Sequence, residues 1–183
     1  MSWPLHHCMS FFSSYILSLT TLALSTMPDS FSSTPISLYT IPLVWATALI
    51  PAAMRNVALV SIKKFNNVSP RANTTRTRSD KAVPPEVSAR IDRMEAAHMN
   101  GNENLPLWAA AVLAANFAGL DTRTVNIVSI VYLVGRILFN YIYINQTTRL
   151  HGTLRSFTFF ATLSLPLYLL FAAATKVAKA GDQ

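Results

Sequence analysis

Residues 124–146, TVNIVSIVYLVGRILFNYIYINQ, decide the fold class, because they form a run long enough to cross a bilayer with one charged side chain, Arg136. Residues 127–134 lack the apolar–polar alternation of a membrane-spanning strand, so the run predicts a helix. Three other stretches have a similar character. We therefore predict an all-α integral membrane protein, a four-transmembrane-helix bundle with spans at about 36–60, 86–119, 124–146 and 153–175.

The composition agrees with a membrane protein. Hydrophobic residues make up 51% of the 183 residues and charged residues 13%, whereas a soluble domain carries about a quarter charged residues. Mean hydropathy is +0.34. The net charge of +7 comes largely from basic residues between Lys63 and Arg93, which lie between apolar spans and lack the interleaved aromatics of a nucleic-acid site. The single cysteine, Cys8, excludes a cysteine-rich metal site, and no metal-ligand spacing is present.

Positive charge also predicts the orientation. The loop at 61–85 and the loop that carries Arg149 and Arg155 are basic, so we expect both in the cytosol and both termini outside. The sequons at Asn67, Asn73 and Asn145 would then stay unglycosylated. Residues 66–83 are polar, basic and contain proline, which predicts a disordered linker.

The chain divides into a membrane domain at 34–176, a tail at 177–183 and an N-terminal extension at 1–33. Residues 9–27 of the extension are uncharged and apolar but rich in serine and threonine. They fit a signal peptide without its basic start, a weak fifth span, or a poorly structured extension, and the sequence leaves these three open.

Polar side chains inside the spans are costly and need an explanation. The prolines before Glu86 predict the start of a long helix, on which Arg93, Ala97, Asn100 and Asn104 share one face, with Glu103 at its edge. The third span repeats the pattern with a stripe of Tyr132, Arg136, Asn140 and Tyr143. Glu103 is the one carboxylate that we place near membrane depth. We therefore predict that Arg136 and Glu103 meet, directly or through a bound ligand. The alternative is that these polar groups only tie the helices together, with His98 at the membrane interface.

The string at 93–108, RMEAAHMNGNENLPLW, resembles the second helix of the MAPEG family, the membrane-associated proteins of eicosanoid and glutathione metabolism. The shared elements are Ala97, Asn100, Glu103 and Pro106. The third span, with YLVGR at 132–136 and Tyr143, and the string GTLRS at 152–156 resemble the third helix of the family and the start of its fourth. Together the resemblance covers about residues 38–174.

The resemblance implies a homotrimer of four-helix subunits in the bilayer, with glutathione as co-substrate between neighbouring subunits near the cytosolic face. Asn100, Glu103 and Tyr143 match positions that contact glutathione, and Arg155 and Ser156 match a pair that stabilises its thiolate. Further candidates to hold the tripeptide are Arg93, His98 and Arg136. Such a set fits the chemistry, because glutathione carries two carboxylates and one ammonium, and a cation near the thiol lowers its pKa.

Three positions depart from the eicosanoid-type members: Ala96 stands in place of an arginine, Phe159 in place of a tyrosine, and Phe139 in place of a polar or tyrosine side chain. The leading hypothesis is a glutathione-dependent transferase or peroxidase that acts on lipophilic electrophiles in the endoplasmic reticulum or another intracellular membrane. The alternatives are a non-enzymatic membrane scaffold or regulator with a structural polar stripe, and a small transporter or channel subunit.

Overall fold

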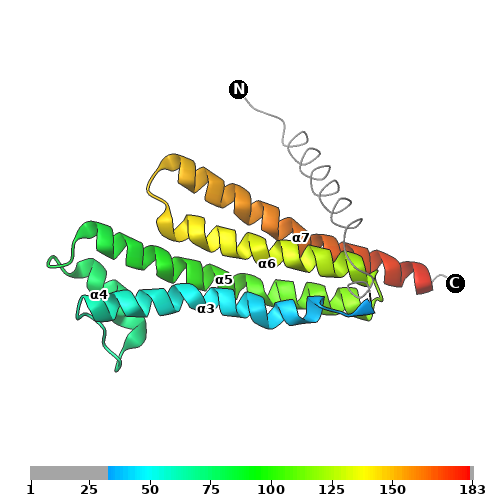
Figure 1. Cartoon of the computed structure of the whole chain (residues 1–183), viewed down its shortest axis with the longest axis horizontal. Coiled ribbons are helices and arrows are strands. Elements are labelled where there is room, and N and C mark those ends of the chain that lie inside the picture. The colour runs from blue at the N-terminus through cyan, green and yellow to red at the C-terminus, as the bar shows by residue number, and fades with distance from the viewer. Residues whose placement is uncertain (1–32, 182–183) are drawn as a thin grey trace. The chain divides into compact units, whose positions relative to one another are not determined.

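The computed structural model describes residues 33–181, and this part of the chain is helical without a strand (Figure 1). Its long helices are α3 (Ser37–Ser61), α5 (Pro85–Phe117), α6 (Thr122–Asn145) and α7 (Arg149–Gly181). The short helices η1 (Pro70–Ala72) and α4 (Asn73–Ser79) lie between α3 and α5. The predictions made for residues 1–32 fall outside the described residues.

Local sequence explains where the helices begin. Helix α5 begins at Pro85, as the double proline before Glu86 predicts, because the first helical turn needs no N–H from its first residue. Helix α6 begins after Asp121, whose carboxylate accepts hydrogen bonds from the backbone N–H of Thr124 at 2.8 Å and from its hydroxyl at 2.6 Å. Helix α7 is longer than the predicted span, so residues 177–181 of the expected tail are helical.

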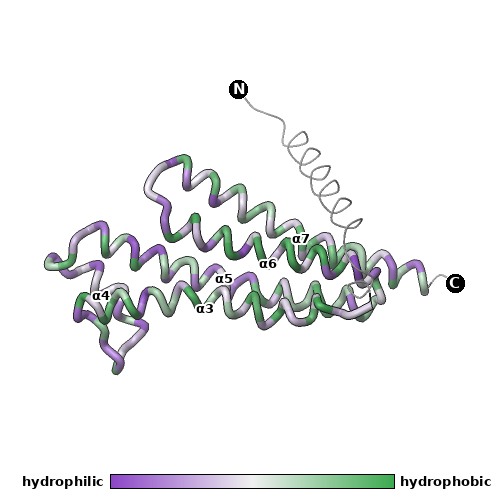
Figure 2. The backbone as a smooth tube through the Cα atoms, in the orientation of Figure 1, coloured by the Kyte–Doolittle hydropathy of each residue, from purple (hydrophilic) through white to green (hydrophobic). Residues whose placement is uncertain are grey.

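Three of the long helices, α3, α6 and α7, are long and apolar enough to cross a membrane. This supports the prediction of an integral membrane protein. Helix α5 does not meet the same criterion, because its first half carries most of its charged residues and its apolar second half is preceded by Asn100, Asn102, Glu103 and Asn104, which lower the hydropathy of that stretch. Figure 2 shows hydrophobic residues concentrated along α3, α6 and α7. A fourth span in α5 stays a prediction.

The described residues divide into two compact units, and each of the four long helices has one part in each unit. Unit 1 contains residues 33–41, 107–134 and 160–181 of the described chain. In its core the rings of Trp108 and Tyr132 stack with centroids 3.9 Å apart. The buried Asn126 fixes the start of α3, because its Oδ1 accepts from the N–H of Ser37 and its Nδ2 donates to the carbonyl of Thr34, both at 2.8 Å.

Unit 2 contains residues 42–106 and 135–159, and it includes Pro51 within α3. Proline has no N–H, so the carbonyl of Thr47 loses its helical donor. The side chain of Asn140 in α6 replaces that donor, with Nδ2 2.9 Å from the Thr47 oxygen. The next carbonyl along α3, that of Ala48, has a partner in α5, because Nδ1 of His98 lies 2.8 Å from its oxygen. Side chains from α6 and α5 thus provide hydrogen-bond partners for the α3 carbonyls before Pro51.

The segment between α3 and α5 corrects one prediction. Residues 66–83 are not a disordered linker, because the side chain of Asn73 is fully buried and holds the segment together. Asn73 Oδ1 accepts from the N–H of Asn66 at 3.0 Å and from Arg76 Nη2 at 2.6 Å, while its Nδ2 donates to the Asn66 carbonyl at 3.2 Å. The composition indicated disorder, but hydrogen bonding by one asparagine orders the backbone without a large apolar core.

Candidate functional site

All eight predicted site residues belong to unit 2. Helix α5 carries Arg93, His98, Asn100 and Glu103, α6 carries Arg136 and Tyr143, and α7 carries Arg155 and Ser156. The structure brings some of these side chains into contact and gives the others backbone partners.

Arg136 is almost completely buried, with 2% of its surface exposed, as expected for a guanidinium within a span. Its Nη2 donates to Asn100 Oδ1 at 3.0 Å, and its guanidinium carbon lies 4.7 Å from the centroid of the Phe139 ring. The direct ion pair with Glu103 is not formed among the described residues, and Glu103 is exposed. Asn100 is the partner because it points towards α6, whereas Glu103 lies at the edge of that helix face.

Glycine at position 101 allows this close arrangement. A Cβ on Gly101 would lie 2.5 Å from the Cβ of Ala48 in α3 and 3.9 Å from Arg136 Nη2. Helix α5 therefore approaches α3 beside the Pro51 irregularity and next to the buried guanidinium. Small residues commonly permit such close contacts between membrane helices.

Aromatic side chains connect Arg136 to Arg155. The Phe139 ring meets Tyr143 edge-to-face at 5.5 Å, and Phe159 lies 6.0 Å from Phe139. The guanidinium of Arg155 lies over the Tyr143 ring, 5.0 Å from its centroid. Two of the positions that depart from the family pattern, Phe139 and Phe159, therefore lie next to each other, with Arg136 over the Phe139 ring.

Arg155 differs from the other arginines of the candidate set in how its donors are used. Its guanidinium is half-buried and stacked on Tyr143, and no hydrogen bond or ion pair to a described residue engages its N–H groups. Arg93 instead donates through Nε to the carbonyl of Ile144 at 2.9 Å, near the last residue of α6. A cation at the carboxyl end of a helix is a common structural arrangement.

Ser156 and His98 both have backbone partners. The hydroxyl of Ser156 donates to the Gly152 carbonyl at 3.1 Å within α7. His98 Nδ1 must carry a proton to donate to the Ala48 carbonyl, and Asn102 Nδ2 lies 3.3 Å from its Nε2. In this arrangement His98 acts as a link between α5 and α3.

Sequence reasoning missed two polar contacts of unit 2. Arg55 of α3, 9% exposed, forms an ion pair with Glu95 of α5, and the Thr74 hydroxyl of α4 lies 3.5 Å from the same carboxylate. Asn140 was placed on the polar stripe, but its role beside Pro51 was not predicted. The signal was available, because a proline always leaves the carbonyl four residues earlier without its N–H donor.

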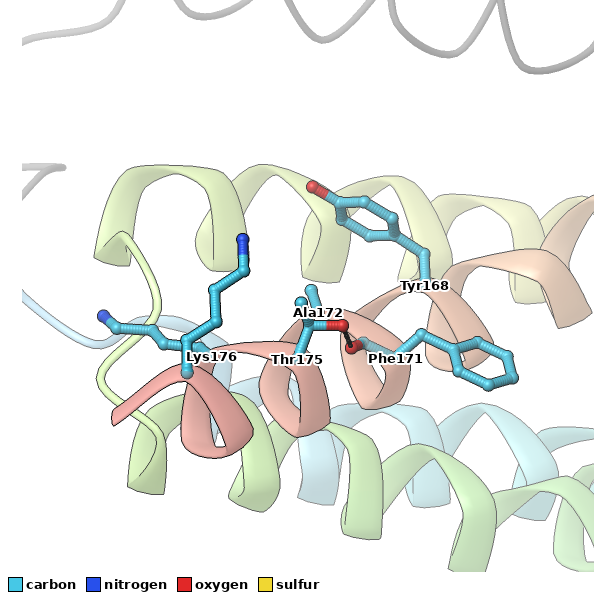
Figure 3. A pocket seen from close by; sticks show the side chains of 6 residues that line it. Tyr168, Phe171, Ala172, Thr175 and Lys176 are labelled. Atoms are coloured by element: carbon cyan, nitrogen blue, oxygen red, sulfur yellow. Dashed lines mark hydrogen bonds between the residues drawn. The ribbon is translucent and has the colours of Figure 1, made fainter. Parts of the chain in front are cut away.

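A shallow hollow on unit 1 contains none of the predicted residues (Figure 3). Helix α7 supplies its whole lining: Tyr168, Phe171, Ala172, Thr175, Lys176 and Lys179. Lys176 donates to the carbonyl of Gly119, and the Thr175 hydroxyl donates to the Phe171 carbonyl at 2.8 Å. Within residues 33–181, no group of three His, Cys, Asp or Glu side chains could hold a metal ion.

Comparison with known families matches residues 36–175 to the model of the MAPEG family. Comparisons with curated proteins and with solved structures give no match. The matched residues cover most of the chain and include every residue of the candidate site, and the helical, membrane-compatible fold agrees with the match. The chain belongs to the MAPEG family.

Proposed function

We propose that the protein is a membrane-bound glutathione-dependent transferase or peroxidase that acts on lipophilic electrophiles dissolved in the bilayer. The observation that carries the proposal is Arg155, a half-buried cation held over the Tyr143 ring with its N–H donors free of described partners. A guanidinium in a partly apolar site, with unused donors, is suited to bind an anion.

In the proposed reaction, Arg155 favours the thiolate form of glutathione over the thiol, and the thiol proton passes to solvent. The thiolate sulfur then attacks the electrophilic carbon. With an activated aryl chloride, a carbon–sulfur bond forms, the carbon–chlorine bond breaks, and chloride leaves. Ser156 can donate a hydrogen bond to the sulfur only after its hydroxyl turns away from the Gly152 carbonyl.

The rest of the tripeptide needs an anionic partner for its ammonium and cationic or polar partners for its carboxylates. Glu103 is exposed and has no cation partner among residues 33–181, so it is available for the ammonium. Asn100 and Arg136, which are hydrogen-bonded to each other, and Tyr143 are the further polar candidates of unit 2. We propose that the site is completed by a neighbouring copy in a homotrimer, since Glu103 is exposed on its own subunit.

The test is conjugation of glutathione to a lipophilic aryl chloride by the full chain in detergent or nanodiscs. We expect Arg155→Ala to reduce turnover by about 100-fold or more, the scale of losing one group that stabilises developing charge, without changing oligomer size. Arg149→Ala is the matched control, because Arg149 is an exposed arginine at the start of the same helix. Equal turnover of wild type and Arg155→Ala would refute the role of Arg155.

A second candidate is a non-enzymatic membrane scaffold or regulator, and a specific observation favours it. Much of the polar stripe already has partners inside the subunit. Arg93 binds the Ile144 carbonyl, His98 the Ala48 carbonyl and Asn140 the Thr47 carbonyl. Such contacts are ordinary links between membrane helices. The scaffold predicts normal assembly with neither glutathione binding nor conjugation.

We also propose an endoplasmic reticulum or other intracellular location, with the segment before α5 and the loop before α7 in the cytosol. The positive charge of these two regions supports this orientation. Glycan on Asn67, which is exposed, would contradict it. Asn73 is less informative because its fully buried side chain is inaccessible in the folded protein.

A further inference from the structure

Residues 62–84, which we name the basic segment, connect α3 to α5 within unit 2. The segment has a defined fold. Asn73 binds Asn66 and Arg76, and the Thr77 hydroxyl donates to the Asn73 carbonyl at 2.8 Å. Figure 1 shows the segment at the ends of α3 and α5, with part of it projecting to the side of α3. If α3 crosses the bilayer, such a projection runs along the membrane surface.

The basic segment has a strong excess of positive charge. Its one carboxylate is Asp80. Its six cations are Lys63, Lys64, Arg71, Arg76, Arg78 and Lys81. Asp80 pairs with Lys64 at 2.6 Å, and Arg78 pairs with Asp92 of α5 at 2.9 Å. The hydrogen bonds from Lys64 and from the N–H of Ala82 lower the pKa of Asp80, so its negative charge persists.

Four exposed cations remain without an acidic partner among the described residues: Lys63, Arg71, Arg76 and Lys81. Arg76 donates instead to the Ser69 carbonyl and to the Asn73 side chain, so Lys63, Arg71 and Lys81 are the three whose charged groups are not held within the segment. They come from both ends and the middle of the segment. The excess charge is therefore not neutralised by the protein itself, and the segment presents it to whatever lies beside α3.

An exposed apolar side chain lies between Lys63 and Arg71 in the sequence. Val68 is 92% exposed, although it belongs to a folded segment. Its position is fixed, because the Asn66 side chain accepts hydrogen bonds from the N–H of Val68 at 2.8 Å and from the N–H of Ser69 at 3.3 Å. Such a turn holds the side chain outward. An exposed apolar side chain flanked by free cations is the composition of a surface that lies on an anionic membrane.

We propose that the basic segment docks on the anionic lipid headgroups of the membrane that α3 spans, with Lys63, Arg71 and Lys81 on the headgroups and Val68 at the boundary with the acyl chains. Charge complementarity selects this partner, and the tethering of the segment to α3 keeps it beside the bilayer. The contact orients the cytosolic ends of α3 and α5, which are also joined through Arg55 and Glu95.

The experiment places an environment-sensitive fluorophore on the segment. The full chain with Cys8→Ser and Val68→Cys is labelled and reconstituted in nanodiscs of phosphatidylcholine, alone or with about 30% phosphatidylserine to supply an anionic surface. We expect a blue shift of emission only with phosphatidylserine. The shift should disappear in about 1 M salt, where the screening length is about 3 Å.

A matched pair of variants tests the cations. Arg71→Gln with Lys81→Gln should weaken the response to phosphatidylserine by roughly 25-fold, because each cation near an anionic surface contributes about a factor of five. Lys176→Gln with Lys179→Gln removes two exposed lysines of α7 and should leave the response unchanged. Unfolding midpoints of all variants, measured in parallel, verify that the fold is intact.

Three results would overturn the proposal. The first is emission that does not depend on phosphatidylserine. The second is an equal loss of response in both variant pairs. The third is the same blue shift in phosphatidylcholine nanodiscs after addition of soluble glycerophosphoserine or polyglutamate, which would assign the segment to a free anion or an acidic protein.

Discussion

Replacing Gly101 with alanine tests the packing of α5 against α3 around the buried Arg136. The added Cβ would lie 2.5 Å from the Cβ of Ala48 and 3.1 Å from its Cα. Carbon atoms prefer separations of about 3.5–4.0 Å, so α5 must move away from α3 by about 1 Å. That movement also lengthens the hydrogen bond between His98 and the Ala48 carbonyl, which is 2.8 Å long.

The magnitude follows from two opposing effects. Overpacking a well-packed core costs about 1–3 kcal/mol, and we take the upper end because the Ala48 backbone cannot move aside easily. Alanine in place of glycine returns about 1 kcal/mol through helix propensity. We therefore expect Gly101→Ala to lower the free energy of unfolding by about 2 kcal/mol, or the melting temperature by about 4–8 °C for a chain of this size.

The assay is thermal unfolding in detergent, with two companion variants. Gly152→Ala is the control, because a Cβ there meets nothing within 4 Å and should leave stability unchanged or raise it. Adding Ala48→Gly to Gly101→Ala removes the atom at 2.5 Å and should recover part of the loss, since the two positions are in contact. A melting temperature of Gly101→Ala at or above that of the wild type would refute the reasoning.

Three further predictions concern hydrogen bonds. Asn140→Leu should lower the free energy of unfolding by about 0.6–1.7 kcal/mol, the range for such hydrogen bonds in membranes. The loss should be much smaller in a protein that also carries Pro51→Ala, because alanine restores an N–H donor for the Thr47 carbonyl. Equal losses with and without Pro51→Ala, measured by thermal unfolding, would contradict this. Asp121→Ala should cost about 1 kcal/mol at pH 7 through the lost cap of α6. The hydrogen bonds from Thr124 lower the pKa of Asp121 in the folded protein. The stability that Asp121 contributes is therefore present above the pKa of the unfolded chain, near 3.9, and is lost as the pH falls through the folded pKa. The melting temperatures of wild type and Asp121→Ala should converge between pH 7 and pH 2, and a constant difference would contradict this. Asn73→Ala should open the basic segment and speed tryptic cleavage at Arg71 and Arg76, and an unchanged cleavage rate would oppose the role given to Asn73.

Sequence reasoning was sufficient for features that repeat along a helix. The inward stripe of α6 is confirmed, because Tyr132, Arg136 and Asn140 are buried and only Tyr143 is half-buried. The family resemblance is also confirmed by the match over residues 36–175. Long apolar runs and helical spacing are local properties, so they can be read without knowledge of packing.

The partners of the polar side chains were harder to predict. Charge alone paired Arg136 with Glu103, but the direction of each side chain from α5 selects Asn100. The pair of Arg55 and Glu95 joins residues far apart in the chain, and the order of the basic segment depends on one buried asparagine. These contacts depend on how helices rotate against each other, which periodicity does not specify.

The central claim is that Arg155 stabilises a glutathione thiolate, and thiolate absorbance in the ultraviolet tests it most directly. Wild-type protein in nanodiscs is titrated with millimolar glutathione across pH, next to Arg155→Ala. A free cysteine thiol has a pKa near 8.5, so we expect bound glutathione to show thiolate absorbance at neutral pH in the wild type and to lose it in Arg155→Ala. No thiolate signal with the wild type, or the same signal with Arg155→Ala, would contradict the account and favour the scaffold.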